Sequence, residues 1–399
     1  MSKAFENIKV VDFSQVLAGP FATQQLAFLG ADVVKVEAPN GEGGRHIRAK
    51  ADTAPAGMSA VFLSVNAGKR SMTLDLKNPG AKAVVERLLR DADVVIQNFK
   101  VGVIQRLGFS YDVVRELNPN IIYCSISGYG QVGPKSAAAA YDPAIQSASG
   151  MMQLVGTDAS GPLRTGFPLV DMTTGLNAAI AIMGALHRRK ETGTGQHLDV
   201  AMLDSAMALL AFPFLQYQLT GAEPERLGNG SQLKTPTADV FATAEGHIQV
   251  TALTDKQVAA LLDTLQLTHL LDDPRFADAD ARSEHRFQMA ALLEQTFALR
   301  TAVQWADSLG ANGVPSSAVL TLSEALGQEQ LQHRNFIKQL TPLGMDAPLS
   351  LFSAPYAASE DGPDLTLPPP GVGEHTSAVL MEAGYTESEI TQLREAKVI

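Results

Sequence analysis

Three consecutive segments near the N-terminus decide the fold: IKVVDF at residues 8–13, GPFATQQLAFLGA at 19–31 and DVVKVEA at 32–38. The outer two are short runs rich in β-branched residues, which favour strands, and the middle one has the length and composition of a helix. A strand, a helix and a second strand in this order predict a βαβ unit, whose two strands lie parallel in one sheet.

The same alternation continues to about residue 130. Strands are predicted at 71–76 (SMTLDL), 93–99 (DVVIQNF) and 121–127 (IIYCSIS), and a helix at 79–91 (PGAKAVVERLLRD). Strands that alternate with helices predict a mostly parallel sheet covered on both faces. The predicted fold class is therefore α/β.

A second domain is expected because a chain of 399 residues exceeds the usual size of a single hydrophobic core. Residues 221–237 (GAEPERLGNGSQLKTPT) lose all periodicity and are predicted to be a linker. Beyond them, ADVFAT and HIQVTAL flank an AEG turn and predict a β-hairpin, which is followed by helical stretches and a strand ending near residue 321. We therefore predict a separate small domain at 238–325.

Composition excludes several classes of partner and location. The net charge is −11 without a concentrated basic stretch, whereas nucleic-acid binding needs a positive face. The N-terminus lacks the basic start and apolar run of a signal peptide, and the apolar segment 176–186 is well short of the roughly 20 residues that cross a bilayer. Cys124 is the only cysteine, which excludes an intramolecular disulfide and a cysteine metal cluster. We expect a cytoplasmic protein with no nucleic-acid or membrane partner.

Several common catalytic motifs are missing from the sequence: GxxxxGK[ST], HExxH, GxSxG, and GxGxxG after the first strand. His187 and His197 lie ten residues apart, a spacing that has no meaning for a metal site. No metal is therefore expected, and the sequence offers no evident histidine base that would activate a serine. A carboxylate is the reactive group that remains.

Asp171 follows the Gly/Pro-punctuated stretch SGPLRTGFPLV and directly precedes a long predicted helix that ends at Gly193. An aspartate in this position commonly caps the helix, and that interpretation stays open. The position also suits a nucleophile, because an aspartate is ionised at neutral pH and helix N–H dipoles favour the anion. Attack of the carboxylate on a thioester gives a mixed anhydride, which preserves the reactivity of the acyl group and needs no general base.

Two further regions could hold an anion. The turn at 12–20 ends a strand and opens a helix, whose free N–H groups can bind phosphate, although Ser14 and Gly19 are also ordinary residues for a helix start. Basic side chains flank the next strands, at Lys69, Arg70, Lys77, Lys100 and Arg106. They predict either an anion site for a ligand with several phosphates or solvated strand flanks, and the pattern alone favours solvated flanks.

Several ordered motifs resemble those of the family III CoA-transferases, the group that contains formyl-CoA transferase, carnitine CoA-transferase and α-methylacyl-CoA racemase. The resemblance covers essentially the whole chain. It is carried by VLAGPFATQQLAFLGADVVKVEAP, NAGKRSMTLDLK, QNFKVGVIQRLG, CSISGYGQVGP, AYDPAIQSASG, LVDMTTG, FATAEGHIQV and GVGEHTSAVL. The shared order and spacing of these motifs make the resemblance specific.

This resemblance implies roles for particular residues. Asp171 aligns with the nucleophilic aspartate that forms an acyl anhydride and then an aspartyl-CoA thioester. The positions that align with the CoA pocket are Gln15, Val16, Leu17, Leu74, Lys77, Asn98, Phe99, Lys100, Arg106 and Tyr141. Acyl-CoA and carboxylic acids are then the substrates, and no permanently bound cofactor is expected.

An assembly is implied as well. Family members form interlocked homodimers, in which each chain is threaded through the other. Each has a Rossmann-like large domain built from both chain ends and a smaller α+β domain between them. In this chain the large domain is expected at 1–220 and 326–399, and the second stretch begins with a return linker that contains a proline-rich segment near 363–373.

The chain also departs from the family pattern. Many members carry Arg or Lys where this chain has Ala139, and some carry Arg where it has Ala38, so two contacts to CoA are in doubt. GNGSQLKTP replaces the GGGG loop of formyl-CoA transferases, which weakens an oxalate/formyl assignment. The racemase branch has a histidine at the position of Tyr141, so the tyrosine favours transfer over racemisation.

The sequence thus predicts an acyl-CoA:carboxylate CoA-transferase that moves CoA between dicarboxylic acids, with succinyl-CoA as the donor. Two alternatives remain open. One is a racemase or isomerase of 2-methylacyl-CoA, for which a base pair of His and Asp is expected. The other is a CoA-binding homologue without turnover, which the changes at Ala38 and Ala139 would favour.

Overall fold

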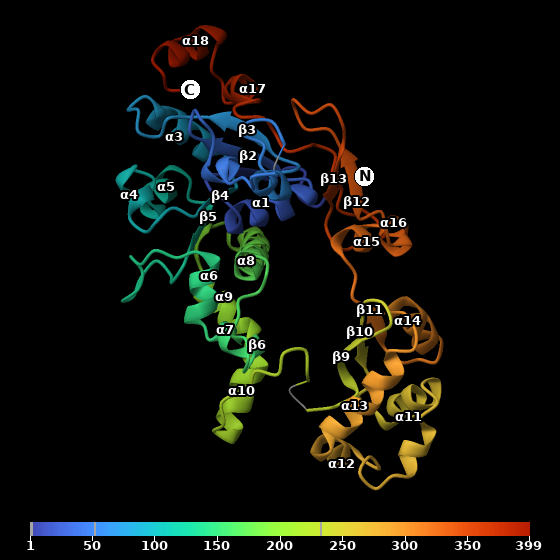
Figure 1. Ribbon diagram of the computed structural model, residues 1–399. Helices are drawn as coiled ribbons and strands as arrows, with labels where there is room; N and C mark the ends of the chain where they lie inside the picture. Colours follow the sequence, from blue (N-terminus) through green and yellow to red (C-terminus); the bar gives the residue numbers. More distant parts are fainter. Residues whose placement is uncertain (1–2, 52, 232–233) are drawn as a thin grey trace. The chain divides into compact units, whose positions relative to one another are not determined.

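The computed structural model describes residues 3–51, 53–231 and 234–399, and the chain forms two compact units (Figure 1). The first unit comprises Met1–Met151, Thr165–Ala211 and Gln330–Ile399, and the second comprises Met152–Arg164 and Phe212–Glu329. Gln232 and Leu233, which belong to the predicted linker, lie outside the described residues.

A six-stranded parallel sheet forms the centre of the first unit, in the order β3-β2-β1-β4-β5-β8. The strands are β1 (Lys9–Asp12), β2 (Asp32–Glu37), β3 (Arg70–Thr73), β4 (Val94–Gln97), β5 (Ile122–Ser127) and β8 (Gln196–Ala201). In the register of the sheet, Val10 of β1 lies opposite Val33 on one side and Val94 on the other. The α/β class and the parallel sheet predicted from the sequence are confirmed.

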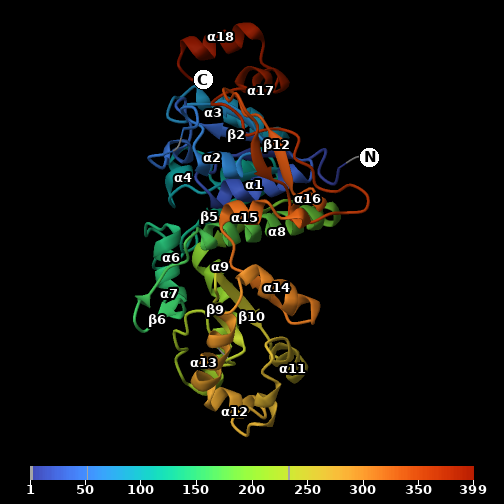
Figure 2. The same cartoon turned by 45° about the vertical axis from the view of Figure 1, so that its right-hand side comes forward.

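Helices cover both faces of this sheet (Figure 2). One face packs against α3 (Ala81–Asp91), α5 (Tyr111–Leu117), α17 (Thr376–Glu382) and α18 (Glu387–Glu395), and the other against α1 (Ala18–Phe28) and α8 (Leu169–Thr192). Helices α1 and α8 lie so close together that a Cβ atom on Gly175 would be 2.6 Å from the carbonyl oxygen of Ala18. The long helix that carries Asp171 is thereby fixed directly against the first βαβ unit.

Helix α8 is longer than the apolar segment 176–186 suggests. Among the described residues, α8 is the one helix whose length and composition would allow it to cross a bilayer. Of its most apolar stretch of 18 residues, 44% is buried inside the protein. Ala178, Ile182 and Ala185 pack into the core beneath the sheet, and Gly193 ends the helix in a left-handed conformation. These contacts are those of a core helix, and they explain by packing the apolar residues on the face of α8 that meets the sheet.

The second unit contains a three-stranded antiparallel sheet in the order β11-β10-β9. The strands are β9 (Ala238–Ala242), β10 (His247–Thr251) and β11 (Ser316–Ala318), and the main helices are α11 (Asp255–Thr264), α12 (Ala279–Glu284), α13 (Arg286–Phe297) and α14 (Ala302–Ala311). Three aromatic rings form the centre of its core: Phe241 stacks on Phe297, and Phe297 meets Trp305 edge to face. The predicted hairpin is confirmed as the pairing of β9 with β10.

Two features differ from the sequence prediction. The segment LDSAMALLAFPFLQYQLTG at 203–221, whose apolar composition predicts one long helix, forms two, α9 (Met202–Leu209) and α10 (Ala211–Thr220). An antiparallel pair, β12 (Ile337–Leu340) with β13 (Leu349–Phe352), was not predicted. The remaining elements are η1 (Gly43–His46), α2 (Ala60–Val65), α4 (Val103–Arg106), α6 (Asp142–Ala148), α7 (Met151–Leu154), β6 (Gly156–Thr157), β7 (Gly161–Pro162), η2 (Thr268–Asp272), α15 (Leu322–Leu326) and α16 (Glu329–His333).

Candidate active site

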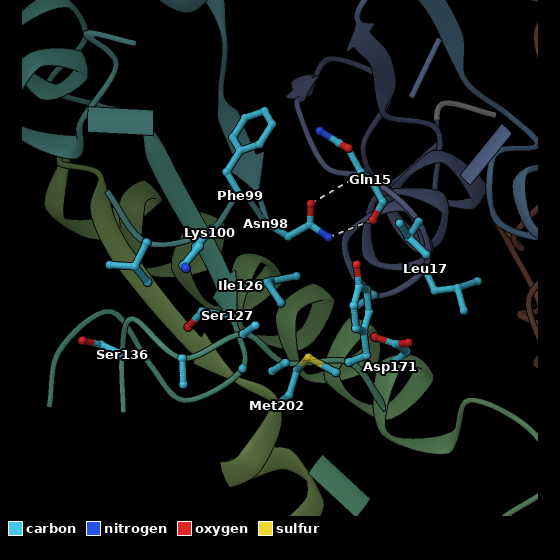
Figure 3. A pocket seen from close by; sticks show the side chains of 18 residues that line it. Gln15, Leu17, Asn98, Phe99, Lys100, Ile126, Ser127, Ser136, Asp171 and Met202 are labelled. Atoms are coloured by element: carbon cyan, nitrogen blue, oxygen red, sulfur yellow. Dashed lines mark hydrogen bonds between the residues drawn. The ribbon is translucent and has the colours of Figure 1, made fainter. Parts of the chain in front are cut away.

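A cavity of about 380 Å³ opens at the carboxyl ends of β1, β4 and β5 in the first unit (Figure 3). Its lining consists of residues 15–18 after β1, 98–101 after β4, 126–128 at the end of β5, residues 136 and 138–141 of the following loop, Asp171 and Met202. The order of the strands reverses between β1 and β4. Ligands of open α/β sheets bind at such switch points, so the topology marks this cavity as the candidate site.

The turn after β1 is held in place by Asn98. The backbone N–H of Gln15 donates to Asn98 Oδ1 at 2.8 Å, and Asn98 Nδ2 donates to the carbonyl oxygen of Gln15, also at 2.8 Å (Figure 3). Gly19 permits the tight entry into α1, since a Cβ atom there would lie 2.3 Å from Ser14 Cβ. The first N–H groups of α1 therefore start beside the cavity, where they favour an anion.

Asp171 lies in the first turn of α8, and it is not the residue that caps this helix. The helix begins at Leu169, two residues before Asp171. The capping carboxylate belongs to Asp142, whose Oδ2 accepts the backbone N–H of Val170 at 2.7 Å and that of Asp171 at 3.0 Å. The interpretation of Asp171 as an N-cap is therefore wrong, and its own carboxylate faces the cavity (Figure 3).

Burial changes the charge expected on Asp171. Desolvation, and to a smaller extent the neighbouring Asp142 carboxylate, raise the pKa of Asp171 from the ordinary 3.8 to about 7. The expectation of a fully ionised aspartate at neutral pH is thus corrected. Near pH 7 the protonated and ionised forms are present in comparable amounts, and a carboxylate of raised basicity is the stronger nucleophile.

A buried hydrogen-bond network fixes Asp142. Gln146 Nε2 donates to Asp142 Oδ1 at 2.6 Å and to Thr165 Oγ1 at 2.8 Å, and Gln146 Oε1 accepts the backbone N–H of Thr165 at 2.9 Å. Asp142 and Gln146 are both buried. Sequence reasoning missed this network. Its signal is the spacing of four residues in DPAIQ, which places an acid and an amide on one face of α6.

The cavity brings together most residues predicted to bind CoA. Those that line it are Gln15, Val16, Leu17, Asn98, Phe99, Lys100 and Tyr141. Leu74, Lys77 and Arg106 are outside its lining as the structure describes it: Leu74 is buried in the core on one face of the sheet, and Lys77 and Arg106 are exposed. Whether any of these residues binds CoA stays a prediction.

Other lining residues were not predicted from the sequence. They are Ala18, Val101, Ile126, Ser127, Gly128, Ser136, Ala138, Ala140 and Met202, and the lining also includes Ala139, the position where many family members carry a basic residue. Ser127 Oγ is a buried side-chain atom without a hydrogen-bond partner in the described structure. Its position at the end of a predicted parallel strand is the signal that could have identified it, because that edge of a parallel sheet carries the site.

Lys69 and Arg70 are neither an anion site nor solvated strand flanks. Lys69 is buried, donating to Pro20 O at 2.8 Å, Asn66 Oδ1 at 2.9 Å and Asp12 Oδ2 at 3.2 Å, and its burial lowers its pKa to about 7. Arg70 forms ion pairs with Asp32 and Glu382. Both sequence interpretations are therefore wrong for these two residues, whose cationic groups are held by partners within the chain.

Cys124 and His197 lie away from the cavity lining. Cys124 is buried, and desolvation raises its pKa to about 12, so its thiolate is scarcely populated at neutral pH. His197 Nε2 is 2.9 Å from Ser125 Oγ, and its ring stacks on Tyr111. Among the described residues, no group of three or more His, Cys, Asp or Glu side chains is arranged to hold a metal ion.

Comparison with known proteins gives consistent matches along nearly the whole chain. Residues 5–376 match the family described as CoA-transferase family III. An acyl-CoA transferase of Fusarium pseudograminearum is 36% identical over 99% of this chain and 88% of the relative, and a succinate–glutarate CoA-transferase of Agrobacterium fabrum is 34% identical over 96% of both. The crystal structure of a CAIB/BAIF family protein from Brucella suis superposes with a TM-score of 0.86 at 32% identity, covering 96% of this chain and all of that one.

Proposed function

This chain belongs to CoA-transferase family III and is a CoA-transferase that acts between carboxylic acids, and we propose on that basis that Asp171 is its nucleophile. The observation that carries the proposal is the position of the Asp171 carboxylate, which faces the cavity at the switch point of the sheet while Asp142 caps the helix in its place. Because Asp171 does not cap the helix, its carboxylate is available to react with a bound thioester.

The reaction proceeds through two covalent states of Asp171. Its carboxylate oxygen attacks the thioester carbonyl of the donor, the C–S bond breaks, and CoA leaves as the thiolate, which gives an acyl-aspartyl anhydride. The thiolate then attacks the aspartyl carbonyl, the donor acid leaves as a carboxylate, and an aspartyl-CoA thioester remains. The acceptor carboxylate then attacks the aspartyl carbonyl of this thioester, and CoA leaves as the thiolate, which gives a new anhydride. The thiolate attacks the acyl carbonyl of that anhydride, which gives the new acyl-CoA and free Asp171.

The site supports this chemistry in two ways. Asp171 is ionised in part near pH 7, and its raised pKa makes the ionised form a better nucleophile than an ordinary aspartate. The apolar side chains of Leu17, Phe99 and Met202 line the same cavity. They help to exclude water, which would hydrolyse the anhydride and the thioester.

We propose dicarboxylates as the acids and succinyl-CoA as the donor. The similarity to the Agrobacterium fabrum relative, a succinate–glutarate CoA-transferase, supports this choice. Lys100 is the only cationic side chain among the described residues that line the cavity, so one positive charge is available for the phosphates of CoA or for a second carboxylate. No histidine is among those residues, which gives no support to the alternative 2-methylacyl-CoA racemase.

The active form we propose is an interlocked cytoplasmic homodimer, with a large domain from 1–220 and 326–399 and a small domain at 238–325. Support comes from helix α10, none of whose residues is buried within this chain. Its large apolar side chains are exposed, including Phe212 at 61% and Leu219 at 86%. An apolar surface of this kind is typical of a protein interface.

A coupled assay tests the proposal. Succinyl-CoA is incubated with a panel of monocarboxylic and dicarboxylic acids, and the appearance of each new CoA ester is followed by chromatography. CoA transfer to at least one dicarboxylic acid is expected. Exchange of the α-hydrogen of 2-methylacyl-CoA with deuterium, without CoA transfer, would support the racemase. Tight CoA binding without turnover of any acid would support the non-catalytic homologue.

A further inference from the structure

Val16 has a backbone conformation that its side chain disfavours. Its φ is +66°, in the left-handed region, where a β-branched residue is a genuine outlier. Among the described residues, the other non-glycine positions with positive φ are Lys234, Gln266, Asn335 and Lys397, and none of them is β-branched. Val16 also lines the cavity. A strained conformation persists only where its surroundings hold it, and such positions cluster at functional sites.

Side chains from separate parts of the chain hold the backbone around Val16. Glu42 Oε2 accepts the backbone N–H of Val16 at 3.1 Å. One residue earlier, Asn98 pairs with both backbone polar groups of Gln15. One residue earlier again, Lys35 Nζ donates to the carbonyl oxygen of Ser14 at 2.7 Å. Three consecutive residues are therefore fixed by groups that lie far from them in the sequence.

The charged members of this arrangement are buried. Lys35 and Glu42 form an ion pair at 3.8 Å, and both are almost completely shielded from solvent. Asp12 is also buried and accepts hydrogen bonds from the backbone N–H of Ser14 at 2.8 Å and from its hydroxyl group. Apolar residues of similar volume could give the same or greater stability than buried ions. What these ions provide is fixed geometry, because their hydrogen bonds hold the backbone of residues 14–16, part of which forms one wall of the cavity.

We propose that Glu42 is a positioning residue, which holds Val16 in the left-handed conformation and thereby fixes the wall at residues 15–17 against which acyl-CoA binds. The inference rests on the proposed function of the cavity and deepens it. Without the Glu42 carboxylate, Val16 relaxes toward negative φ, since that removes the steric cost, and the wall changes shape. Glycine at this position has no such cost, so it keeps the left-handed conformation without the carboxylate.

A double-mutant cycle tests this role. Glu42→Ala in the wild-type background removes the acceptor of the Val16 N–H, and kcat/KM for acyl-CoA is expected to fall about tenfold or more, as for loss of a charge-assisted hydrogen bond. In the Val16→Gly background the same change is expected to cost less than about threefold, because no strain is released. Equal losses in both backgrounds would overturn the proposal.

Val101→Gly supplies the matched control, because Val101 also lines the cavity and is not among the residues with positive φ. In that background Glu42→Ala should retain its full cost. Val16→Gly should not lower the melting temperature, whereas Val101→Gly should lower it by about 2 °C or more, since glycine loses more backbone freedom on folding. A similar fall for both valine variants would count against strain at Val16.

Two further measurements keep the outcome decisive. If Glu42→Ala does not fold, Glu42→Leu takes its place in the cycle; it fills a similar volume without an acceptor oxygen, and the same dependence on the residue at 16 is expected. Acyl-CoA affinity, measured by calorimetry, is read in parallel with turnover. A wild-type enzyme that binds acyl-CoA but transfers nothing contradicts the proposed function, while a cycle without coupling in either readout contradicts the role of Glu42.

Discussion

The side-chain carboxylate of Asp142 accepts the backbone N–H of Asp171 at 3.0 Å, so one acid caps the helix that carries the other. This contact places two acidic residues at the start of α8, one buried and hydrogen-bonded and one facing the cavity. The capping carboxylate contributes to the raised pKa of Asp171, although desolvation contributes more. Several properties of the enzyme should follow from this arrangement.

The first prediction concerns the pH dependence of the rate. In the proposed mechanism only ionised Asp171 attacks the thioester, and its pKa is about 7, so kcat/KM should rise with pH and level off above that value. Initial rates with succinyl-CoA between pH 5.5 and 8.5 measure this. Asp142→Asn removes one of the two causes of the raised pKa and should move the acid limb to lower pH. A flat profile in the wild-type enzyme would show that Asp171 does not titrate in this range.

A second prediction is that Asp171→Asn abolishes CoA transfer, because an amide cannot form the anhydride or the aspartyl-CoA thioester. In the wild-type enzyme, hydroxylamine or borohydride added after acyl-CoA should modify the peptide that contains Asp171 and no other. Asp204→Asn, an exposed aspartate in the first turn of α9, is the control and should retain activity. Near-wild-type transfer by Asp171→Asn, with its mass showing no deamidation, would exclude the mechanism.

The contribution of Asp171 to stability should depend on pH in the opposite sense to activity. The pKa of Asp171 is raised in the folded state, from 3.8 to about 7, so the folded state binds the proton more tightly than the unfolded state. Its contribution to the free energy of unfolding therefore falls as pH rises between these values, by at most about 4 kcal/mol. The Asp171→Asn variant has no carboxyl group to ionise at this position, so it avoids this fall in the free energy of unfolding. It should be more stable than the wild-type protein in urea denaturation at pH 8. Lower stability of the variant at that pH would contradict burial as the cause.

The fourth prediction concerns Lys100, which lines the cavity. Lys100→Met should raise KM for acyl-CoA about tenfold, the loss expected for one charge-assisted contact to an anionic group. Lys190→Met, an exposed lysine in the last turn of α8, should leave KM unchanged. The same measurement on Lys77→Met and Arg106→Met tests the two predicted contacts that the cavity lining does not include. Unchanged KM for Lys100→Met would remove this lysine from the site.

The fifth prediction concerns assembly. Interlocked chains cannot separate without unfolding, so the proposed dimer should persist on dilution to nanomolar concentration, as measured by mass photometry. Leu215→Glu places a charge on the exposed apolar surface of α10 and should reduce the yield of assembled dimer. Thr220→Glu, at the end of the same helix, is the milder control. A folded and active monomer at nanomolar concentration would disprove interlocking.

The sequence by itself determined the fold class, and it pointed to Asp171 as the residue at the centre of the proposed site. β-Branched runs and helical segments are local patterns, so the strand, helix and strand of residues 8–38 are legible without knowledge of the rest of the chain. The local position of Asp171, between a Gly/Pro-punctuated stretch and a long helix, left a helix cap and a nucleophile both open, and the resemblance of LVDMTTG to a family motif is what implied the nucleophile. These features depend on neighbours within a few residues.

Only the tertiary structure decided what surrounds that residue. Asp142 lies 29 residues from Asp171, and no local pattern indicates that it caps α8. Lys69 looked like a solvated or anion-binding cation until folding placed it against Asp12, 57 residues away. Charge state and cavity shape depend on burial and on contacts between distant segments, and both exist only after packing. For this reason the sequence could suggest Asp171 as the nucleophile, whereas its pKa and the hydrogen bond from Val16 to Glu42 required the folded chain.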